Sequence, residues 1–183
     1  MSDPSSVAPI VSFDDEPLIL VDSQDNVLGY KPKAEAHEGD GVLHRAFSIF
    51  LFDGTGKVWL QQRAPGKQLW GGYWANSCCS HPRRGETLDD AAARRLHEEL
   101  GVNAELTFLY RFEYHAHFGD IGAEHELCSV YVAKSDTPVT TNANEIAASQ
   151  AVVLPIPASP SKTSAAGPRC TAVTKSVTAW WCG

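Results

Sequence analysis

The residues in this sequence whose types and spacing could do chemistry are a group of histidines and glutamates: His37, His44, His81, Glu124 and Glu126. The two glutamates stand two positions apart, so on a strand their carboxylates would project from one face. Neutral imidazoles and carboxylates are ligands that Mn²⁺, Mg²⁺ or Zn²⁺ can use. Any one of the histidines could instead be an ordinary loop residue, but together with the glutamates they predict a closed metal site of three imidazoles and two carboxylates.

A second candidate group lies on a predicted helix from Leu88 to Leu100. Thr87 begins this helix with a capping-box pattern, and Gly101 ends it. On a helical wheel, Arg95 and Glu99 fall on the face that carries the apolar side chains Leu88, Ala91, Ala92 and Leu96. Because an unpaired buried charge is costly, these two residues either pair with each other at the edge of the core or face a ligand.

The segment around this helix resembles the Nudix box, which reads Gly, five residues, Glu, seven residues and then Arg-Glu-apolar-x-Glu-Glu-x-Gly-apolar. The positions in register are Glu86, Arg94, Leu96, Glu98, Glu99, Gly101 and Val102. Ser80 replaces the first Gly, and Arg95 replaces the Glu of the Arg-Glu pair. The carboxylates of that motif gather the divalent metals that activate water, so the loss of one argues against pyrophosphate hydrolysis. A guanidinium at this position suits the binding of an intact diphosphate instead.

Three further segments resemble those of type 1 isopentenyl-diphosphate isomerases: His37-x6-His44-Arg45-Ala46-Phe47-Ser48, Trp74-Ala75-Asn76-Ser77-Cys78-Cys79-Ser80-His81-Pro82 and Glu124-His125-Glu126-Leu127-Cys128. The resemblance runs from about Leu18 to about Ala133, and its segments agree in order and approximate spacing. It implies a Nudix-like α/β fold of mixed sheets around a central Nudix-box helix. It also implies an enzyme that interconverts isopentenyl diphosphate and dimethylallyl diphosphate through a tertiary carbocation, with this small-molecule isoprenyl diphosphate as its substrate.

The resemblance also implies the acid and the base of such a reaction. Moving a double bond requires one group that delivers a proton to a carbon and another that removes one. By resemblance these groups are Cys79 and Glu126, in an order left open, with Tyr114 beside the glutamate as a proton relay. The neighbouring Cys78 could be an inert small hydrophobe. Trp74 could present its π face to the cation or simply pack.

The positions that match the family's diphosphate-binding residues are Lys33, Arg63, Lys67 and Arg95. By the same resemblance, Glu99 would hold a Mg²⁺ ion that bridges the phosphates. Lys33 and Lys67 could otherwise be plain surface lysines, because only the resemblance singles them out. Two other functions stay open: a Nudix hydrolase that cleaves a nucleoside or other diphosphate, and a non-catalytic binder of diphosphate or metal.

The composition limits the partners and the compartment. With 15 Lys and Arg against 22 Asp and Glu, the formal net charge is −7, which argues against nucleic acid or an anionic membrane surface as a partner. The sequence has no apolar run of about 20 residues and no secretory signal, so we expect a cytoplasmic protein. Its five cysteines are then reduced. We expect a monomer or a weak homodimer.

The elements that must position these residues are predicted by hydrophobic pattern and turn signals. Strands are predicted at Leu18–Val21, Val27–Tyr30, Ala46–Phe52, Lys57–Arg63, Leu106–Phe112 and Leu127–Val132. The first two form a hairpin, as do the next two across Asp53-Gly54-Thr55-Gly56, and the apolar run of Ala46–Phe52 is typical of a central strand. The order of strands, helix and strands indicates one mixed α/β domain over residues 17–145, after a loose segment over residues 1–16.

Residues 146–183 differ from the rest of the chain. They contain no Asp, Glu or His, although 22 acids and seven histidines precede them. Apart from a strand at Ala151–Leu154, no regular structure is predicted there, and the Pro-Trp segment that covers the active site in the resembled family has no counterpart. A change of reading frame near codon 147 would explain this difference. The chain would then be impaired as an enzyme, because water could reach the carbocation.

Overall fold

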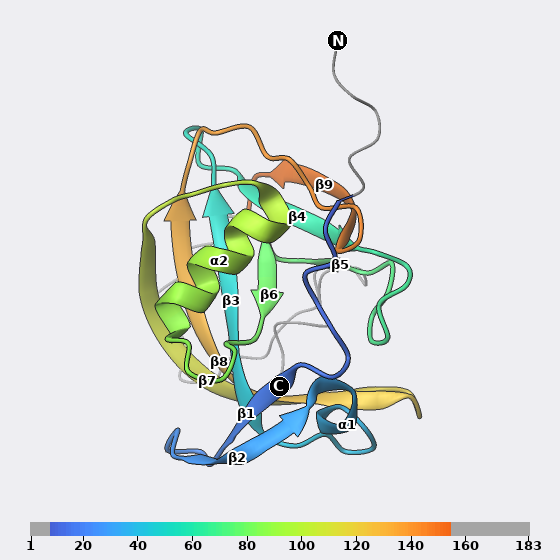
Figure 1. The fold of residues 1–183 in the computed structure, drawn as a ribbon. Coiled ribbons are helices and arrows are strands. Elements are labelled where there is room, and N and C mark those ends of the chain that lie inside the picture. The colour runs from blue at the N-terminus through green and yellow to red at the C-terminus, as the bar shows by residue number, and fades with distance from the viewer. Residues whose placement is uncertain (1–7, 155–183) are drawn as a thin grey trace, which may run out of the picture.

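A computed structural model describes residues 8–154 and arranges them as a mixed sheet with one long helix packed against it (Figure 1). In chain order the elements are β1 (Pro17–Val21), β2 (Val27–Pro32), α1 (Lys33–Ala36), β3 (His44–Phe52), β4 (Val58–Arg63), β5 (Trp74–Ala75), β6 (Cys78–Ser80), α2 (Leu88–Leu100), β7 (Leu106–Phe118), β8 (Gly122–Lys134) and β9 (Ile146–Val152). The short helix α1 has no counterpart among the predicted elements. The predicted α/β fold of mixed strands around the box helix is confirmed.

Strand β3 is central in the sheet, as its apolar run predicted. It pairs antiparallel with β1, β4 and β6 and parallel with β8. Its side chains Phe47, Ile49 and Leu51 are fully buried. The register with β8 sets His44 beside Glu126. Two predicted site residues from distant parts of the sequence therefore become neighbours.

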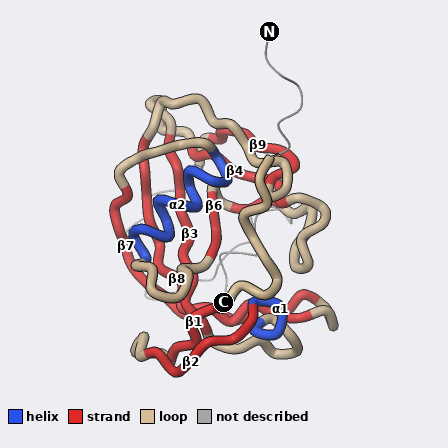
Figure 2. The backbone as a smooth tube through the Cα atoms, viewed as in Figure 1, coloured by secondary structure: helices blue, strands red, loops and turns tan. Residues whose placement is uncertain are grey.

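Helix α2 spans the predicted residues, and both of its ends carry the expected caps. The Thr87 side chain accepts a hydrogen bond of 3.1 Å from the Asp90 backbone N–H, and Gly101 takes a left-handed φ of 67°. The helix packs against β3, β6 and β7 (Figure 2). It contributes four buried apolar side chains to the core: Ala91, Ala92, Leu96 and Leu100. Neither α2 nor any other helix within residues 8–154 is long and apolar enough to cross a bilayer.

The hairpin of β7 and β8 is longer than predicted. Strand β7 runs to Phe118 instead of Phe112, and β8 begins at Gly122 instead of Leu127. Residues 107–113 of β7 are all exposed, whereas its outer part alternates exposed side chains with the partly buried Tyr114, Ala116 and Phe118. The predicted strand ended before this alternation, so Tyr114 lies on a part of the hairpin that the prediction left out.

The second predicted hairpin forms its turn but little of its ladder. Within the described residues, β3 and β4 pair only at Phe52 and Val58, and β4 continues in pairing with β5 and β9. Strand β9 begins at Ile146, earlier than the strand predicted at Ala151, because β4 offers it a partner along its length. The hypothesis of a changed reading frame near codon 147 concerns residues 146–183, of which 155–183 lie outside the described part of the chain, and it stays a prediction.

Residues 8–16, expected to be loose, lie against the domain. Val11 is buried, and its carbonyl oxygen accepts a hydrogen bond of 2.6 Å from Arg95 Nη1. The Asn142 side-chain amide donates a hydrogen bond of 2.9 Å to the Pro9 carbonyl oxygen. The segment is therefore fastened beside the charged face of α2.

Gly122, where β8 begins, packs directly on the backbone that carries His37. An added Cβ would lie 2.3 Å from the His37 carbonyl oxygen, which also accepts a hydrogen bond from the Ala123 N–H. We expect Gly122→Ala to lower the free energy of unfolding by about 1–3 kcal/mol through overpacking, as measured by urea denaturation. Gly29→Ala is the matched control, because nothing lies within 4 Å of a Cβ at that position of β2. The control should change stability by no more than about 0.5 kcal/mol, and equal losses in the two variants would contradict the packing argument.

Candidate active site

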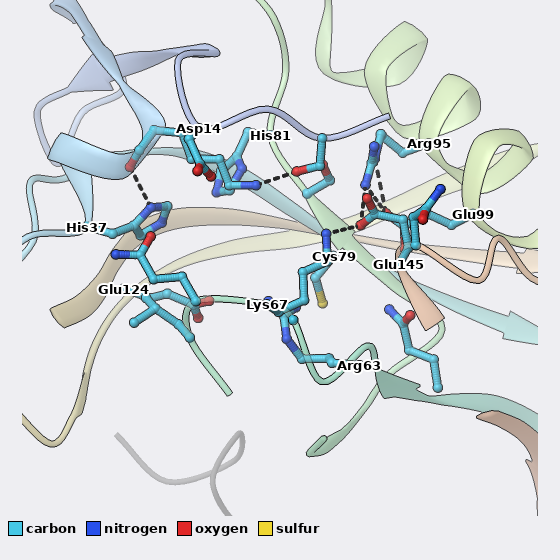
Figure 3. A pocket seen from close by; sticks show the side chains of 18 of the residues that line it. Asp14, His37, Arg63, Lys67, Cys79, His81, Arg95, Glu99, Glu124 and Glu145 are labelled. Carbon is cyan, nitrogen blue, oxygen red and sulfur yellow. Dashed lines mark hydrogen bonds and ion pairs between the residues drawn. The ribbon is translucent and has the colours of Figure 1, made fainter. Parts of the chain in front are cut away.

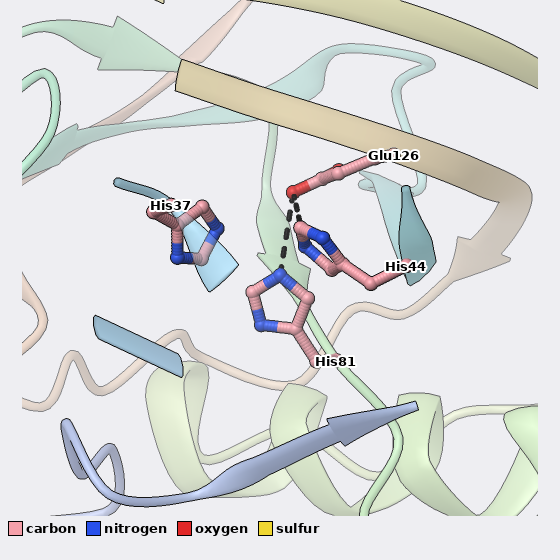
Figure 4. Close-up of side chains that lie close together, drawn as sticks. All are labelled: His37, His44, His81 and Glu126. Atoms are coloured by element: carbon pink, nitrogen blue, oxygen red, sulfur yellow. Dashed lines mark hydrogen bonds and ion pairs between the residues drawn. The ribbon is translucent and has the colours of Figure 1, made fainter. Parts of the chain in front are cut away.

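Three imidazoles and one carboxylate meet where β3 and β8 run side by side (Figure 4). One ligand atom from each of His37, His44, His81 and Glu126 lies within 4.8 Å of the others, and all four residues are buried. The ring centroid of His44 lies 4.9 Å from that of His37 and 4.9 Å from that of His81. Glu126 Oε1 lies 3.3 Å from His81 Nε2 and 3.8 Å from His44 Nε2. Such a buried cluster could bind a metal ion.

The ring orientations of His37 and His44 are fixed by hydrogen bonds on the outer side of this cluster. His37 Nδ1 lies 2.8 Å from the Lys33 carbonyl oxygen, and His44 Nδ1 lies 2.7 Å from that of Val42. These bonds make each Nδ1 the donor and leave each Nε2 with a lone pair. His44 Nε2 is buried without a hydrogen-bond partner. Burial is the largest cause that lowers the pKa of all three imidazoles, so they stay neutral, which is the form that binds metals.

Glu124, the second predicted carboxylate ligand, lies beside this cluster. The Tyr114 hydroxyl contacts both glutamates, at 2.7 Å from Glu126 Oε2 and 2.9 Å from Glu124 Oε2. Burial and the neighbouring Glu126 raise the pKa of Glu124 to about 8, and burial also raises the pKa of Glu126. Two buried carboxylates this close repel each other when both are ionised, so the pair favours either a shared proton or a bound cation.

The two adjacent cysteines of β6 have different surroundings, because successive side chains of a strand point to opposite faces. Cys78 is fully buried in the core between the sheet and α2. Cys79 lines a cavity, and its Sγ donates a hydrogen bond of 2.6 Å to Asn76 Oδ1 and lies 3.3 Å from Ser48 Oγ. Burial raises the pKa of the Cys79 thiol to about 12. At neutral pH this thiol therefore keeps its proton.

A cavity of about 330 Å³ joins these groups to a set of charged side chains. Figure 3 shows His37 and Glu124 on one side of it and Arg95, Glu99 and Glu145 on the other. All four cations selected by the family resemblance line it: Lys33, Arg63, Lys67 and Arg95. Trp74, in β5, is half-buried and is not among the described side chains that line this cavity.

The charges near α2 are paired with one another. Arg95 Nη2 donates to Glu99 Oε1 at 2.5 Å and to Glu145 Oε2 at 3.2 Å. Lys67 forms an ion pair with the same Glu145 oxygen. Arg95 and Glu99 therefore pair with each other, which is the first of the two alternatives predicted for them. Both residues also line the cavity, where a ligand could bind. Glu145 was not singled out in the sequence, because no local motif marks it and only the fold brings it to its partners.

Two of the cations have features that suit the binding of an anion. Lys33 Nζ donates to Ser12 Oγ at 2.6 Å, and its pKa is lowered to about 8, first by burial and then by the charges of Lys67 and Arg95. Arg63 Nε is buried without a hydrogen-bond partner. A bound anion would relieve the repulsion among these cations and accept a hydrogen bond from Arg63.

The fold and the sequence can now be compared with known proteins. The NUDIX domain family matches residues 42–166. Among solved structures, the chain is similar to DR0079 from Deinococcus radiodurans, with a TM-score of 0.61 and 26% identity over 75% of this chain and 83% of that one. The chain is also similar to a MutT NUDIX hydrolase from Burkholderia pseudomallei, with a TM-score of 0.51 and 21% identity over 63% of this chain and 88% of that one. At this identity the likeness concerns the fold alone. These matches place the chain in the NUDIX class.

Sequence identity to named relatives shows which family within the NUDIX class the chain belongs to. The chain is 49% identical over 135 residues to Isopentenyl-diphosphate Delta-isomerase 1 of Photorhabdus laumondii subsp. laumondii, which is 73% of this chain and 77% of that protein. It is 51% identical over 123 residues to Isopentenyl-diphosphate Delta-isomerase of Serratia proteamaculans, which is 67% of this chain and 68% of the relative. The chain therefore belongs to the isopentenyl-diphosphate Delta-isomerase family.

The unpartnered nitrogen of His44 makes this residue the sharpest probe of metal binding. We expect His44→Ala to weaken Mn²⁺ binding by at least about tenfold. Removing a residue that only hydrogen-bonds to a metal ligand already costs about that much, and His44 is proposed as a ligand itself. Electron paramagnetic resonance of free Mn²⁺ during titration measures this affinity. His97→Ala is the control, because His97 is exposed on α2. Unchanged affinity in His44→Ala would count against a metal at this cluster.

Proposed function

We propose that the chain interconverts isopentenyl diphosphate and dimethylallyl diphosphate. The observation that carries the proposal is that one cavity is lined by both acid–base candidates, Cys79 and Glu126, and by four cations. A hydrocarbon with a diphosphate head needs both kinds of lining, one for proton transfer and one for anchoring. Relatives of 46–51% identity are named for this isomerisation.

The reaction adds a proton to one carbon and removes a proton from another, so one residue gives a proton and a second residue takes one. The Cys79 thiol holds its proton at neutral pH, because burial raises its pKa to about 12. Glu126 can exchange a proton with the Tyr114 hydroxyl at 2.7 Å. Tyr114 also contacts Glu124, so a proton has a short path among these oxygens.

We assign a divalent metal, Mn²⁺, Mg²⁺ or Zn²⁺, to His37, His44, His81 and Glu126, with Glu124 as a further ligand. The neutral imidazoles and the unpartnered His44 Nε2 suit this role. When bound, such an ion lowers the pKa of a coordinating carboxylate and compensates its charge. The hydrogen bond from Tyr114 would then hold the two carboxylates in place.

We assign the diphosphate to Lys33, Arg63, Lys67 and Arg95, with a Mg²⁺ ion at Glu99. Arg95 and Lys67 are paired with acids. Binding therefore requires an exchange of partners. The phosphate oxygens would accept the hydrogen bonds that now go to Glu99 and Glu145, and Mg²⁺ would neutralise the carboxylates that are released.

The thiols of β6 offer a matched pair of variants. We expect Cys79→Ala to lower the rate of dimethylallyl diphosphate formation by about 10²–10⁴-fold, since the proton carrier is removed. Cys78→Ala should keep most of the activity, because that side chain packs in the core. The assay supplies isopentenyl diphosphate with Mg²⁺ and follows both dimethylallyl diphosphate and released phosphate. Equal losses in the two variants would refute the assignment, and phosphate release by the wild type would indicate a hydrolase.

Arg63 offers a separate test of the diphosphate site. We expect Arg63→Ala to raise KM for isopentenyl diphosphate by about 10- to 150-fold. This factor corresponds to the roughly 1.5–3 kcal/mol that a hydrogen bond to a charged group contributes to binding. Arg84→Ala is the control, because the Arg84 guanidinium is exposed and lies over the Tyr30 ring. Steady-state kinetics measure both variants. A KM for Arg63→Ala equal to that of the control would remove Arg63 from the site.

A further inference from the structure

The seven histidines of the chain fall into three groups. Three form the buried cluster described above, and one, His97, is exposed on α2. The remaining three lie on the β7–β8 hairpin, where His115 pairs directly with His125 and His117 follows two positions along β7. Because side chains alternate along a strand, these three share the face opposite to the one that carries Tyr114.

The three outer imidazoles lie close together. The rings of His115 and His125 are stacked, with centroids 4.5 Å apart and an angle of 22° between their planes. The His117 ring lies 4.7 Å from that of His115. Two histidines at alternate positions of one strand and a third directly across from the first can converge on one ion at the usual Zn–N distance of about 2.0–2.1 Å, provided that the rings turn from the stacked arrangement seen here so that their in-plane lone pairs meet.

The outer imidazoles also have the supporting hydrogen bonds that metal ligands use. His115 Nε2 lies 2.5 Å from the Asp40 carbonyl oxygen, and His125 Nε2 lies 3.0 Å from Glu113 Oε1. Each of these bonds fixes the ring and, when Nε2 donates, leaves Nδ1 with a lone pair. His37 and His44 of the buried cluster are held by the same kind of contact to backbone carbonyl oxygens.

Charge and exposure favour a cation from solution at this place. The Asp40 carboxylate lies 4.0 Å from His117 Nε2, and Glu113 adds a second acid beside His125. The His117 side chain is 51% exposed, so it can rotate toward the stacked pair. Core packing does not explain the three rings, because His115 and His117 are exposed and His125 is partly exposed.

We propose that His115, His117 and His125 form a second metal site, selective for a borderline transition metal such as Zn²⁺. Three imidazoles are a known ligand set for zinc, and water or the nearby Asp40 carboxylate completes the tetrahedron. A bound ion crosslinks β7 and β8. Through the Asp40 contacts it also fastens the hairpin to the loop that follows His37. The site stabilises the strands that carry Tyr114 and Glu126 without entering the cavity.

The test uses the untagged full-length protein and Zn²⁺ alone, with equilibrium dialysis followed by elemental analysis. We expect the double variant His115→Ala/His117→Ala to hold one zinc fewer per chain than the wild type. His97→Ala, which removes an exposed histidine outside the hairpin, should hold as much zinc as the wild type. The cysteines are the same in all three proteins, so the difference isolates the hairpin site.

A second measurement separates loss of the site from loss of the fold. The double variant should retain wild-type isomerisation, since it leaves every cavity residue in place, and a folded far-ultraviolet circular dichroism spectrum. Glu113→Ala should weaken the same zinc by about 10- to 100-fold, as expected for removal of a supporting partner. Equal zinc content in the double variant and the wild type would overturn the proposal, as would an equal loss in His97→Ala.

Discussion

The register of β8 against β3 is the constraint on which the rest of the site depends. It sets Glu126 beside His44 where the two parallel strands begin to pair. A shift of one residue would turn Glu126 to the opposite face and bring His125 inward, because side chains alternate along a strand. Further along the same pairing, Phe47 and Ile49 are fully buried in the core that α2 closes. The apolar core therefore holds the register that the polar site requires.

In this register, ionisable imidazole and carboxyl groups, which are more stable in water, are buried in the domain. Burial raises the pKa of Glu124 and Glu126 and lowers the pKa of the facing imidazoles, so each group is driven toward its neutral form. Neutral imidazoles are ready ligands, whereas the carboxylates need a positive partner before they ionise. A divalent ion meets both needs at once. At Lys33 in the same cavity, burial and then the neighbouring cations Lys67 and Arg95 lower the pKa, and a bound anion would raise it again.

The parts of this arrangement that the sequence predicts are those with local causes. Helix α2 begins after its N-cap Thr87 and ends before its C-cap Gly101, as their residue types predict. The position of β3 as a central strand was predicted by its apolar run. The outer half of β7 has only a short alternation at Tyr114, Ala116 and Phe118, which follows the uniformly exposed residues 107–113 and which the predicted strand left out. Glu145 acquires its role only through ion pairs with residues far away in the sequence. The resemblance to a family selected the site residues, but the pairing of Tyr114 with both glutamates required the register of the hairpin.

Arg95 connects the fold to the proposed chemistry. In the Nudix box its position holds a carboxylate, and such carboxylates gather the metal ions that activate water. Here the guanidinium is buried on the inner face of α2 and pairs with Glu99 and Glu145. It occupies one of the metal-binding positions of the motif. A tertiary carbocation survives only where water is kept from it. The exchange of one carboxylate for a cation on this helix therefore favours binding of an intact diphosphate and also disfavours the competing hydrolysis.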